Sequence, residues 1–401
     1  MDGIVNATTD GSAQPEREEL IAKARELHPL LREYVSRAEV GRQAAPEVVE
    51  ALTEAGFFRL MKPRRLGGNE VGLRTLVEVT ETLGEGDGSA AWLVGVGAVA
   101  AWLVGTASKQ AQEDLFAQDP DARVAGGSSP GPARRVEGGY RVSGRWPYAS
   151  GAHGSSWATM GAVLTDESGQ MSDALVCVAP ASDLTLERTW QTVGMRGTGS
   201  DTWVADDVFV PDHRTISIGQ VVAGKWPLPT EETMYLLPAG PLGLLGLLGP
   251  ILGLGRAALD YVIAQAPRKG MHHTFFARQA DSVGVQIQLA EAALKLKTAK
   301  LHTYAIADAI DAAASRGEQV EYADRAEYRA EYGYVAQQVL EALQILINVH
   351  GAGAFAESNP LQQWWRDANT AAHHAGLNAA VGYEVYGKSL VGVDEQVSPM
   401  I

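Results

Sequence analysis

The stretch VGMRGTGS at residues 193–200, followed by DVFVP at 207–211, marks a part of the chain where helical patterns give way to a β-type pattern. Its three glycines separate Arg196, Thr198 and Ser200, and glycine allows a backbone to approach a ligand closely. A β-bulge or a turn would use the same composition. The stretch therefore predicts either a ligand-contacting loop or a bulge within a β-region.

The predicted β-region around this stretch spans residues 125–222. Turn residues such as Gly138-Gly139 separate short runs of strand-forming residues. These runs are 140–142, 157–164, 174–179, 185–190 and 202–210. The single cysteine, Cys177, lies in an apolar run, so we expect it in the core and expect no disulfide or cysteine-based metal site.

Helical periodicity marks the chain on both sides of the β-region. In residues 1–124, the sequence Asp87-Gly88-Ser89 is expected to cap an almost uncharged helix over 90–105. In residues 223–401, four helices are predicted at about 250–266, 282–317, 322–351 and 359–390. The sequence thus predicts an α+β protein with an N-terminal helical domain (1–124), a central β-domain (125–222) and a C-terminal four-helix bundle (223–401).

Composition excludes several functions. The chain of 401 residues has 33 Lys and Arg against 48 Asp and Glu, a net charge of -15, which argues against a nucleic-acid or anionic-membrane partner. The apolar stretch 240–255 contains two prolines and is too short to cross a bilayer, so it predicts a buried helix. The N-terminus lacks the pattern of a secretory signal, and we expect a cytoplasmic protein.

The sequence contains no recognisable metal-binding or nucleotide-binding motif. The histidine pairs 272–273 and 373–374 are adjacent, without metal-ligand spacing, so no metal site is expected. No glycine-rich dinucleotide motif follows a strand, and no phosphate-binding P-loop is present. The sequence therefore gives no local support for nicotinamide binding.

Four segments in a fixed order carry a resemblance to a known family. They are GRWPYASG at 144–151, VGMRGTGS with DVFVP at 193–211, HGAG at 350–353, and WRDA at 365–368 followed by His373 and His374. From about residue 20 to 395 the chain resembles the acyl-CoA dehydrogenase superfamily. This resemblance implies an N-terminal helical domain, a central β-barrel domain and a C-terminal four-helix bundle.

The catalytic glutamate of the dehydrogenases is missing. Its usual place, nine residues after the Arg of the Arg-Asp-Ala motif, is Ala375, and its alternative place falls near Gly243. Without a base no proton can be removed from carbon, so acyl-CoA dehydrogenation is disfavoured. The chain is instead similar to two-component flavin-dependent monooxygenases on the same fold, which include phenol hydroxylases and aromatic polyketide hydroxylases of secondary metabolism.

The resemblance implies a reaction and partners. Reduced flavin, FMNH2 or FADH2, and O2 would form a C4a-hydroperoxide that hydroxylates a small aromatic molecule. A separate NAD(P)H:flavin reductase would supply the reduced flavin. In the family, the residues matching Gly351 and Gly353 contact the flavin of a neighbouring subunit, which implies a homotetramer.

The same resemblance assigns cofactor-binding residues. Ser150 would hydrogen-bond to flavin N5, and Trp146 and Tyr148 would wall the ring. Further flavin-binding candidates, drawn from the glycine-rich segments, are Gly151, Arg196, Thr198, Ser200, Gly351 and Gly353. From the residues alone, Ser150-Gly151 is also a common turn pair.

His374 and Ser150 are the predicted catalytic side chains. Ser150 would act through its bond to the flavin, and His374, which stands beside the missing glutamate, would act as a base or as a hydrogen-bond donor. Neighbouring helix positions point in different directions, so only one of His373 and His374 is expected to face the pocket. Arg366 and Asp367 are expected to form a structural ion pair.

The substrate is less closely defined. Several phenol hydroxylases of this group carry a phenolate-contacting histidine at the position that is Ala100 here. A bulkier aromatic polyketide or an indole therefore stays open, as does N- or S-oxygenation of an amine, amino sugar or thioether. A scaffold that binds no flavin is the non-enzymatic alternative.

Overall fold

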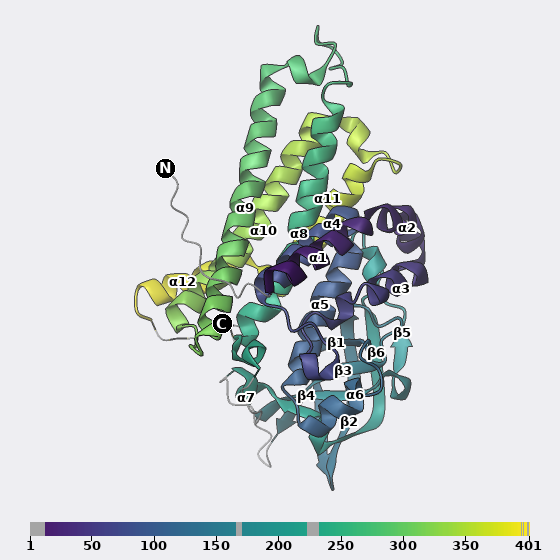
Figure 1. The fold of residues 1–401 in the computed structure, drawn as a ribbon, viewed down its shortest axis with the longest axis vertical. Coiled ribbons are helices and arrows are strands. Elements are labelled where there is room, and N and C mark those ends of the chain that lie inside the picture. The colour runs from purple at the N-terminus through teal and green to yellow at the C-terminus, as the bar shows by residue number, and fades with distance from the viewer. Residues whose placement is uncertain (1–12, 166–170, 223–231, 394, 396, 399–400) are drawn as a thin grey trace.

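Helices, a sheet and longer helices follow one another along the chain (Figure 1). The computed structural model describes residues 13–165, 171–222, 232–393, 395, 397–398 and 401. The first group of helices is α1 (Ala13–Glu26), α2 (His28–Gly41), α3 (Pro46–Glu54), α4 (Leu73–Gly86), α5 (Gly88–Gly105) and α6 (Lys109–Phe116). The predicted cap of α5 is present, because the Asp87 carboxylate accepts a hydrogen bond from the Ser89 N–H at 3.0 Å.

A seven-stranded sheet occupies the middle of the described chain, in the order β5-β6-β2-β1-β3-β4-β7. Its strands are β1 (Val124–Val136), β2 (Gly139–Ala149), β3 (Trp157–Thr165), β4 (Met171–Pro180), β5 (Thr185–Glu187), β6 (Asp201–Pro211) and β7 (Thr215–Ser217). Strands β1 and β3 are parallel, with Val124 opposite Trp157, and the other pairs are antiparallel. The five predicted runs all fall within strands, except that the run 185–190 continues past the end of β5.

Strand β1 was not predicted, although it lies at the centre of the sheet. Its sequence is rich in Gly, Ser and Pro, which normally indicate a loop. A side chain at Gly126 would collide with Thr159, and one at Gly127 would lie 2.6 Å from the Pro147 carbonyl oxygen. Glycine is therefore required because two neighbouring strands press against β1, and its pairing on both sides compensates for its low strand propensity.

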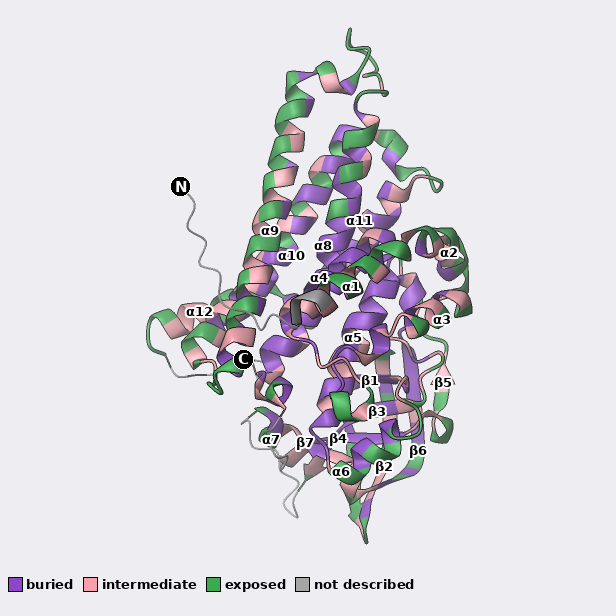
Figure 2. Ribbon diagram, viewed as in Figure 1, coloured by how far each residue is buried: buried purple, intermediate pink, exposed green. Residues whose placement is uncertain are grey.

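The C-terminal helices are arranged around α10 (Tyr322–His350), which packs against α8 (Ala239–Gln265), α9 (Val283–Ser315), α11 (Pro360–Ala372) and α12 (Ala379–Leu390). Short α7 (Ile218–Val222) precedes them. Helix α8 begins at Ala239 and continues through Pro250, where the sequence had placed its start. Figure 2 shows that α8 and α10 are mostly buried, whereas the outer face of α9 is exposed.

The predicted helix over 359–390 is wrong, because α11 and α12 are separate helices. Between them lies a short 3-10 turn, Ala375–Leu377. A side chain at Gly376 would collide with Leu244 of α8, and Asn378 caps α12 by accepting a hydrogen bond from the Val381 N–H at 3.3 Å. The break brings the His374 segment against the start of α8.

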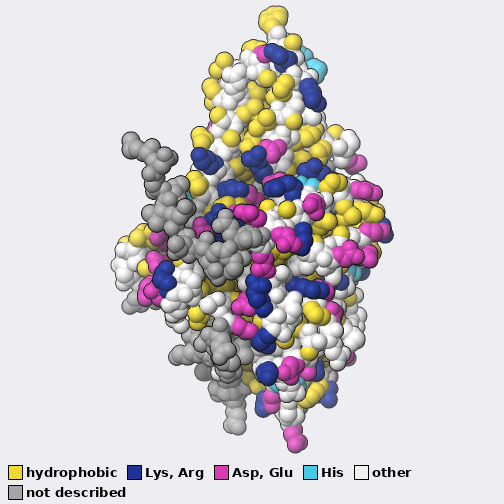
Figure 3. All heavy atoms as spheres, viewed as in Figure 1, with side chains coloured by type: hydrophobic (Ala, Val, Ile, Leu, Met, Phe, Trp, Pro, Cys, Tyr) yellow, Lys and Arg dark blue, Asp and Glu magenta, His cyan; other side chains and the backbone are white. Residues whose placement is uncertain are grey.

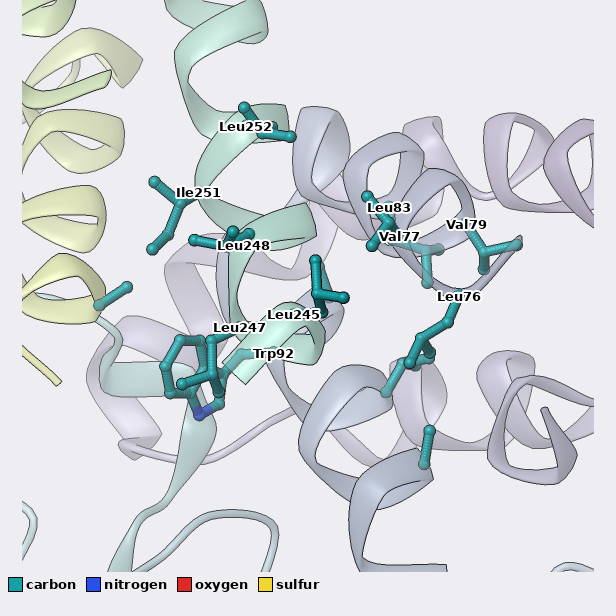
Figure 4. Packing of buried hydrophobic residues seen from close by; sticks show 14 of the residues in the cluster. Leu76, Val77, Val79, Leu83, Trp92, Leu245, Leu247, Leu248, Ile251 and Leu252 are labelled. Carbon is teal, nitrogen blue, oxygen red and sulfur yellow. The ribbon is translucent and has the colours of Figure 1, made fainter. Parts of the chain in front are cut away.

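The two most apolar helices, α5 and α8, are buried in the main core. Figure 4 shows Leu245 of α8 on the side that faces Leu76 and Val77 of α4, with Trp92 of α5 beside Leu247. Each helix is long and apolar enough to cross a membrane, but other helices cover most of its surface. The stretch 240–255 thus belongs to a core helix, as predicted.

Candidate active site

Three hydroxyl groups meet where the sheet joins the helices. Ser150 follows β2, and its Oγ lies 2.7 Å from the Oγ of Ser200. The Ser200 Oγ in turn lies 2.6 Å from Thr198 Oγ1, which donates to the Met195 carbonyl at 2.8 Å. The Gly151 N–H donates to the Thr198 carbonyl at 2.9 Å, which fixes the two loops together. The structure therefore brings the predicted residues Ser150, Thr198 and Ser200 into one hydrogen-bonded cluster, hereafter the hydroxyl cluster.

A cleft opens beside the hydroxyl cluster, between α5, β1 and the loops before α4. Its polar lining includes Ser150, Gly151 and Thr198, together with Gln43, Arg123 and His153. Much of its wall is apolar and comes from Val49, Phe58, Leu93, Gly97, Ala101, Val124 and Ala125. Lys62 also lines it, but its Nζ donates to the carbonyls of Pro120 and Ala122 at 2.7 and 2.8 Å. A mostly apolar wall with a few polar groups at one side is typical of small-molecule sites.

Trp92 connects the hydroxyl cluster to His374. Its indole Nε1–H donates to Ser150 Oγ at 3.2 Å, and its ring contacts the His374 ring edge-on, with centroids 5.9 Å apart. Ser150 and His374 therefore contact the same indole, although they are 224 positions apart in the chain. His374 does not line the cleft that contains Ser150.

The His374 ring has a defined tautomer when neutral. Its Nδ1 accepts a hydrogen bond from the Gly376 N–H at 3.1 Å, so the neutral ring carries its proton on Nε2. Burial among protein atoms and the charge of Arg329 lower the pKa of His374, although its side chain is accessible to solvent. A neutral imidazole held in this way is a hydrogen-bond donor at Nε2.

His373 lies outside the helix, on the exposed surface. Its Nδ1 is 2.7 Å from the Asn369 carbonyl oxygen, and it makes no ring contact with Trp92 among the described residues. Its neighbour His374 is the histidine that meets Trp92. The expectation that helix geometry would separate the two was wrong in its reason, because neither residue lies within α11 or α12.

An exposed aromatic pair stands beside the loop of the hydroxyl cluster. Tyr148 is 69% exposed and adopts a positive φ of 64°, which is rare for a tyrosine. Its ring meets Trp190 edge-on with centroids 6.1 Å apart. An exposed aromatic side chain in a strained conformation is a common feature of binding sites.

The predicted role of Trp146 requires a correction. Its side chain is fully buried in the second, smaller core that lies within the sheet, and its Nε1–H donates to the Gly161 carbonyl at 2.8 Å. The side chain therefore has no surface that could wall a cofactor. The alternation of a strand explains the error, because Trp146 and Tyr148 have the spacing of one face but the chain turns at Tyr148.

Arg366 and Asp367 do not form the expected ion pair by hydrogen bonding to each other. Arg366 Nη2 pairs with Glu39 at 2.9 Å, and Nη1 donates to the Val193 carbonyl. The buried Asp367 carboxylate accepts from the Met195 N–H at 2.5 Å, and burial raises its pKa to about 7. Both residues thus hold the 193–199 loop onto α11.

The remaining candidates lie apart from the cleft. Arg196 faces Glu39 with an N–O distance of 3.9 Å, and its Nε has no partner among the described residues. Gly351 ends α10 with a positive φ of 78°, and an added Cβ there would meet nothing within 4 Å of this chain. Gly353 is exposed as well. Neither glycine lines the cleft within this chain.

The observed groups suit a planar heteroaromatic cofactor with a polar edge. The hydroxyl cluster offers neutral donors and acceptors rather than cations, and Tyr148 offers an exposed ring. Gly199, with a positive φ of 52°, keeps the loop close to its neighbours. This chemistry fits an isoalloxazine ring.

Two family models match the chain. The N-terminal domain of acyl-CoA dehydrogenases matches residues 15–118, and the C-terminal domain matches residues 245–379. The fold and these matches define a protein of the acyl-CoA dehydrogenase superfamily.

Relatives of this chain indicate which group of enzymes within the superfamily it is similar to. The oxygenase subunit HsaA of a flavin-dependent monooxygenase from Rhodococcus jostii is 30% identical over 92% of this chain and 97% of the relative. The oxygenase component of an FADH2-dependent resorcinol hydroxylase from a Rhizobium species is 30% identical over 94% of each chain. Among solved structures, XiaF from a Streptomyces species, in complex with FADH2 and glycerol, has a TM-score of 0.92 at 35% identity, covering 96% of this chain and 98% of that one.

The chain belongs to the family of flavin-dependent monooxygenase oxygenase subunits that have the acyl-CoA dehydrogenase fold. The predicted family, fold class and enzyme class are thereby confirmed. Sequence reasoning missed Trp92 as a link between the two halves of the site. Its only signal was its place four residues after the start of α5, on a buried helix.

Proposed function

We propose that this protein is the oxygenase component of a two-component system that hydroxylates a small aromatic molecule with reduced flavin and O2. The single observation that carries the proposal is the Trp92 bridge, because Ser150 and His374 both contact this one indole. Related proteins are named as a resorcinol hydroxylase and an indole-3-acetate monooxygenase. A separate NAD(P)H:flavin reductase would supply the reduced flavin.

In this proposal the hydroxyl cluster binds the flavin. Ser150 bonds to the polar edge of the ring, Gly151 and Thr198 line the same wall, and Tyr148 covers the ring plane. When bound, reduced flavin converts O2 into an electrophilic oxygen donor. The apolar wall of the cleft excludes water, which would otherwise favour release of H2O2.

His374 acts from the substrate side as a hydrogen-bond donor. The Gly376 N–H occupies its Nδ1, so Nε2–H is free to donate to an oxygen of the substrate. A base at Nε2 would require the proton on Nδ1, where it would face the Gly376 N–H. Of the two roles predicted from sequence, the donor role has the better geometry.

The test is oxygen incorporation. Full-length protein is supplied with a flavin reductase, NADH, FAD and 18O2, with resorcinol or indole-3-acetate as substrate. We expect one 18O atom in a hydroxylated product and less H2O2 than in a reaction without the oxygenase. Product without 18O, or H2O2 equal to the flavin oxidised with every aromatic tested, would contradict the proposal.

We further propose FAD as the flavin and a homotetramer as the active form. FADH2 is named for two of the similar proteins. The exposed residues Val283, Ile287, Leu294 and Leu301 follow one another at helix spacing along α9, and Figure 3 shows hydrophobic atoms gathered over this part of the bundle. A second copy would cover this face, and Gly351 and Gly353 would then be available to a neighbouring subunit's flavin. Sedimentation of wild type and Leu294→Glu tests this, since the variant should dissociate.

The location proposed for the protein is the cytoplasm, where NAD(P)H and a flavin reductase are present. Its acidic charge of -15 suits a small-molecule enzyme without a nucleic-acid partner.

A further inference from the structure

One charged side chain in the core is unpaired. Arg329 of α10 is 3% exposed, and its Nε and Nη1 have no hydrogen-bond partner among the described residues. Three residues further on the same helix face, Tyr332 is 1% exposed and its hydroxyl also has no partner within the described chain. Buried polar groups are normally satisfied, and a buried charge without a counter-charge is costly.

Two other charged groups show the contrast. Lys62, which is equally buried but lies in the N-terminal part of the chain, donates its Nζ–H groups to two carbonyl oxygens. Glu331, the acidic neighbour of Arg329 on α10, bonds instead to His302 Nδ1 at 2.7 Å. Arg329 thus keeps two unused donors, although its helix carries carboxylates.

The packing of the helix break places Arg329 near His374. A side chain at Gly382 of α12 would lie 2.5 Å from the Arg329 carbonyl oxygen, and one at Gly333 would collide with Ala379. The segment from His374 to α12 therefore lies against the turn of α10 that contains Arg329. The charge of Arg329 is also close enough to lower the pKa of His374.

Three donors accordingly lie on segments that pack together: the Arg329 guanidinium and the Tyr332 hydroxyl on α10, and the Nε2–H of His374 in the segment that leads into α12. We propose that they form an oxyanion subsite, which binds the ionised oxygen of the aromatic substrate as a phenolate or a carboxylate. The proposal rests on the proposed hydroxylase function and names its substrate class. It also supplies a contact that the alanine at position 100 cannot make. For a phenol, the bound phenolate makes the ring carbons more nucleophilic toward an electrophilic oxygen donor.

Ligand binding without turnover tests the subsite. Full-length protein is titrated with 4-nitrophenol, whose neutral and ionised forms have separate visible absorption bands, and calorimetry compares indole-3-acetate with indole. We expect the protein to bind 4-nitrophenol as the phenolate at a pH where the free compound is mostly neutral, or to bind indole-3-acetate at least tenfold more tightly than indole. The two arms distinguish a phenolate from a carboxylate as the ligand.

Variants assign the effect to Arg329. Arg329→Met should abolish the preference for the ionised probe, with at least tenfold weaker binding, and should leave thermal stability unchanged or raised because it removes an unpaired charge. Arg316→Met, an exposed arginine paired with Glu318 at 2.7 Å, is the control and should bind as wild type. Should Arg329→Met fail to fold, Arg329→Lys decides: it should keep a weakened preference for the ionised probe.

Three results would overturn the subsite. The first is that the wild type prefers neither ionised probe, and the second is that Arg329→Met or Arg329→Lys binds both probes as the wild type does. The third is that Arg329→Met dissociates the oligomer without changing the affinity per chain. The last result would assign Arg329 to a partner's carboxylate. The binding experiment and the 18O2 experiment can fail independently of each other. An intact anion preference without hydroxylation would refute the function and keep the subsite, and the reverse result would refute the subsite alone.

Discussion

Trp92 contacts Ser150 from the sheet and His374 from the helices, and the polar groups of these two sides differ in how completely they are hydrogen-bonded. On the sheet side, Ser150, Ser200 and Thr198 are bonded to one another and to a backbone carbonyl. On the helix side, Arg329 and Tyr332 are buried, but Arg329 Nε and Nη1 and the Tyr332 hydroxyl have no partner among the described residues. The comparison indicates that one side is organised before any ligand binds, whereas the other side reaches full hydrogen bonding only with its ligand.

The largest expected effect comes from removing the centre of the organised side. Ser150→Ala should lower product formed per flavin oxidised about a hundredfold, with a matching rise in H2O2, because a preorganised hydrogen bond at the reacting group is lost. Ser155→Ala, in the same turn, should couple normally. Normal coupling in Ser150→Ala would show that the hydroxyl cluster is structural.

Removing the Asp367 carboxylate, which holds the 193–199 loop onto α11, should have the next largest effect. Asp367→Ala leaves the buried Met195 N–H without its acceptor, and should lower the free energy of unfolding by about 2 kcal/mol. Denaturant unfolding measures this, with the exposed Asp206→Ala as control. Equal stability of the two variants would show that the loop is held by its other contacts.

On the helix side, His374→Ala should lower turnover about tenfold, the cost of one hydrogen bond to a charged or reacting group. His374→Gln retains a donor and should recover most of that loss, whereas a catalytic base could not be replaced by an amide. Equal loss in both variants would favour the base.

The pH dependence of activity tests the role of His374 in a second way. Burial and Arg329 lower the pKa of His374 below its ordinary 6.5, so the ring stays neutral at neutral pH and becomes charged only as the pH falls through the lowered value. Protonation places a hydrogen on Nδ1 opposite the Gly376 N–H and removes the bond that orients the donor ring, so activity should decrease on the acid side. Arg329→Met removes one of the two causes, so the acid limb of the profile for kcat should shift to higher pH. An unshifted limb would place Arg329 too far from His374 to matter.

The smallest effect is expected from a substitution of Trp92, which contacts both Ser150 and His374. Trp92→Phe keeps an aromatic ring beside His374 but removes the N–H that donates to Ser150, and should lower coupling about threefold, as for one neutral hydrogen bond. An effect as large as that of Ser150→Ala would mean that Trp92 positions more than the Ser150 hydroxyl.

Local patterns predicted the order of elements, and family motifs predicted the residues of the hydroxyl cluster. They did not predict β1, because its glycines are required by neighbouring strands that the local sequence does not display. They also missed the break after α11, which depends on contact between Gly376 and Leu244. Arg329 could not be recognised, since an arginine on a helix is usually exposed and only the packed structure shows that it lacks a partner.

The bond between Met195 and Asp367 joins positions 172 residues apart. During synthesis, the 193–199 loop, which we propose binds the flavin, is complete long before α11 leaves the ribosome, yet it has no acceptor for its buried N–H until that helix docks. The proposed flavin site is consequently assembled last, when nearly the whole chain has emerged. Truncated chains that end before α11 would lack this assembled site.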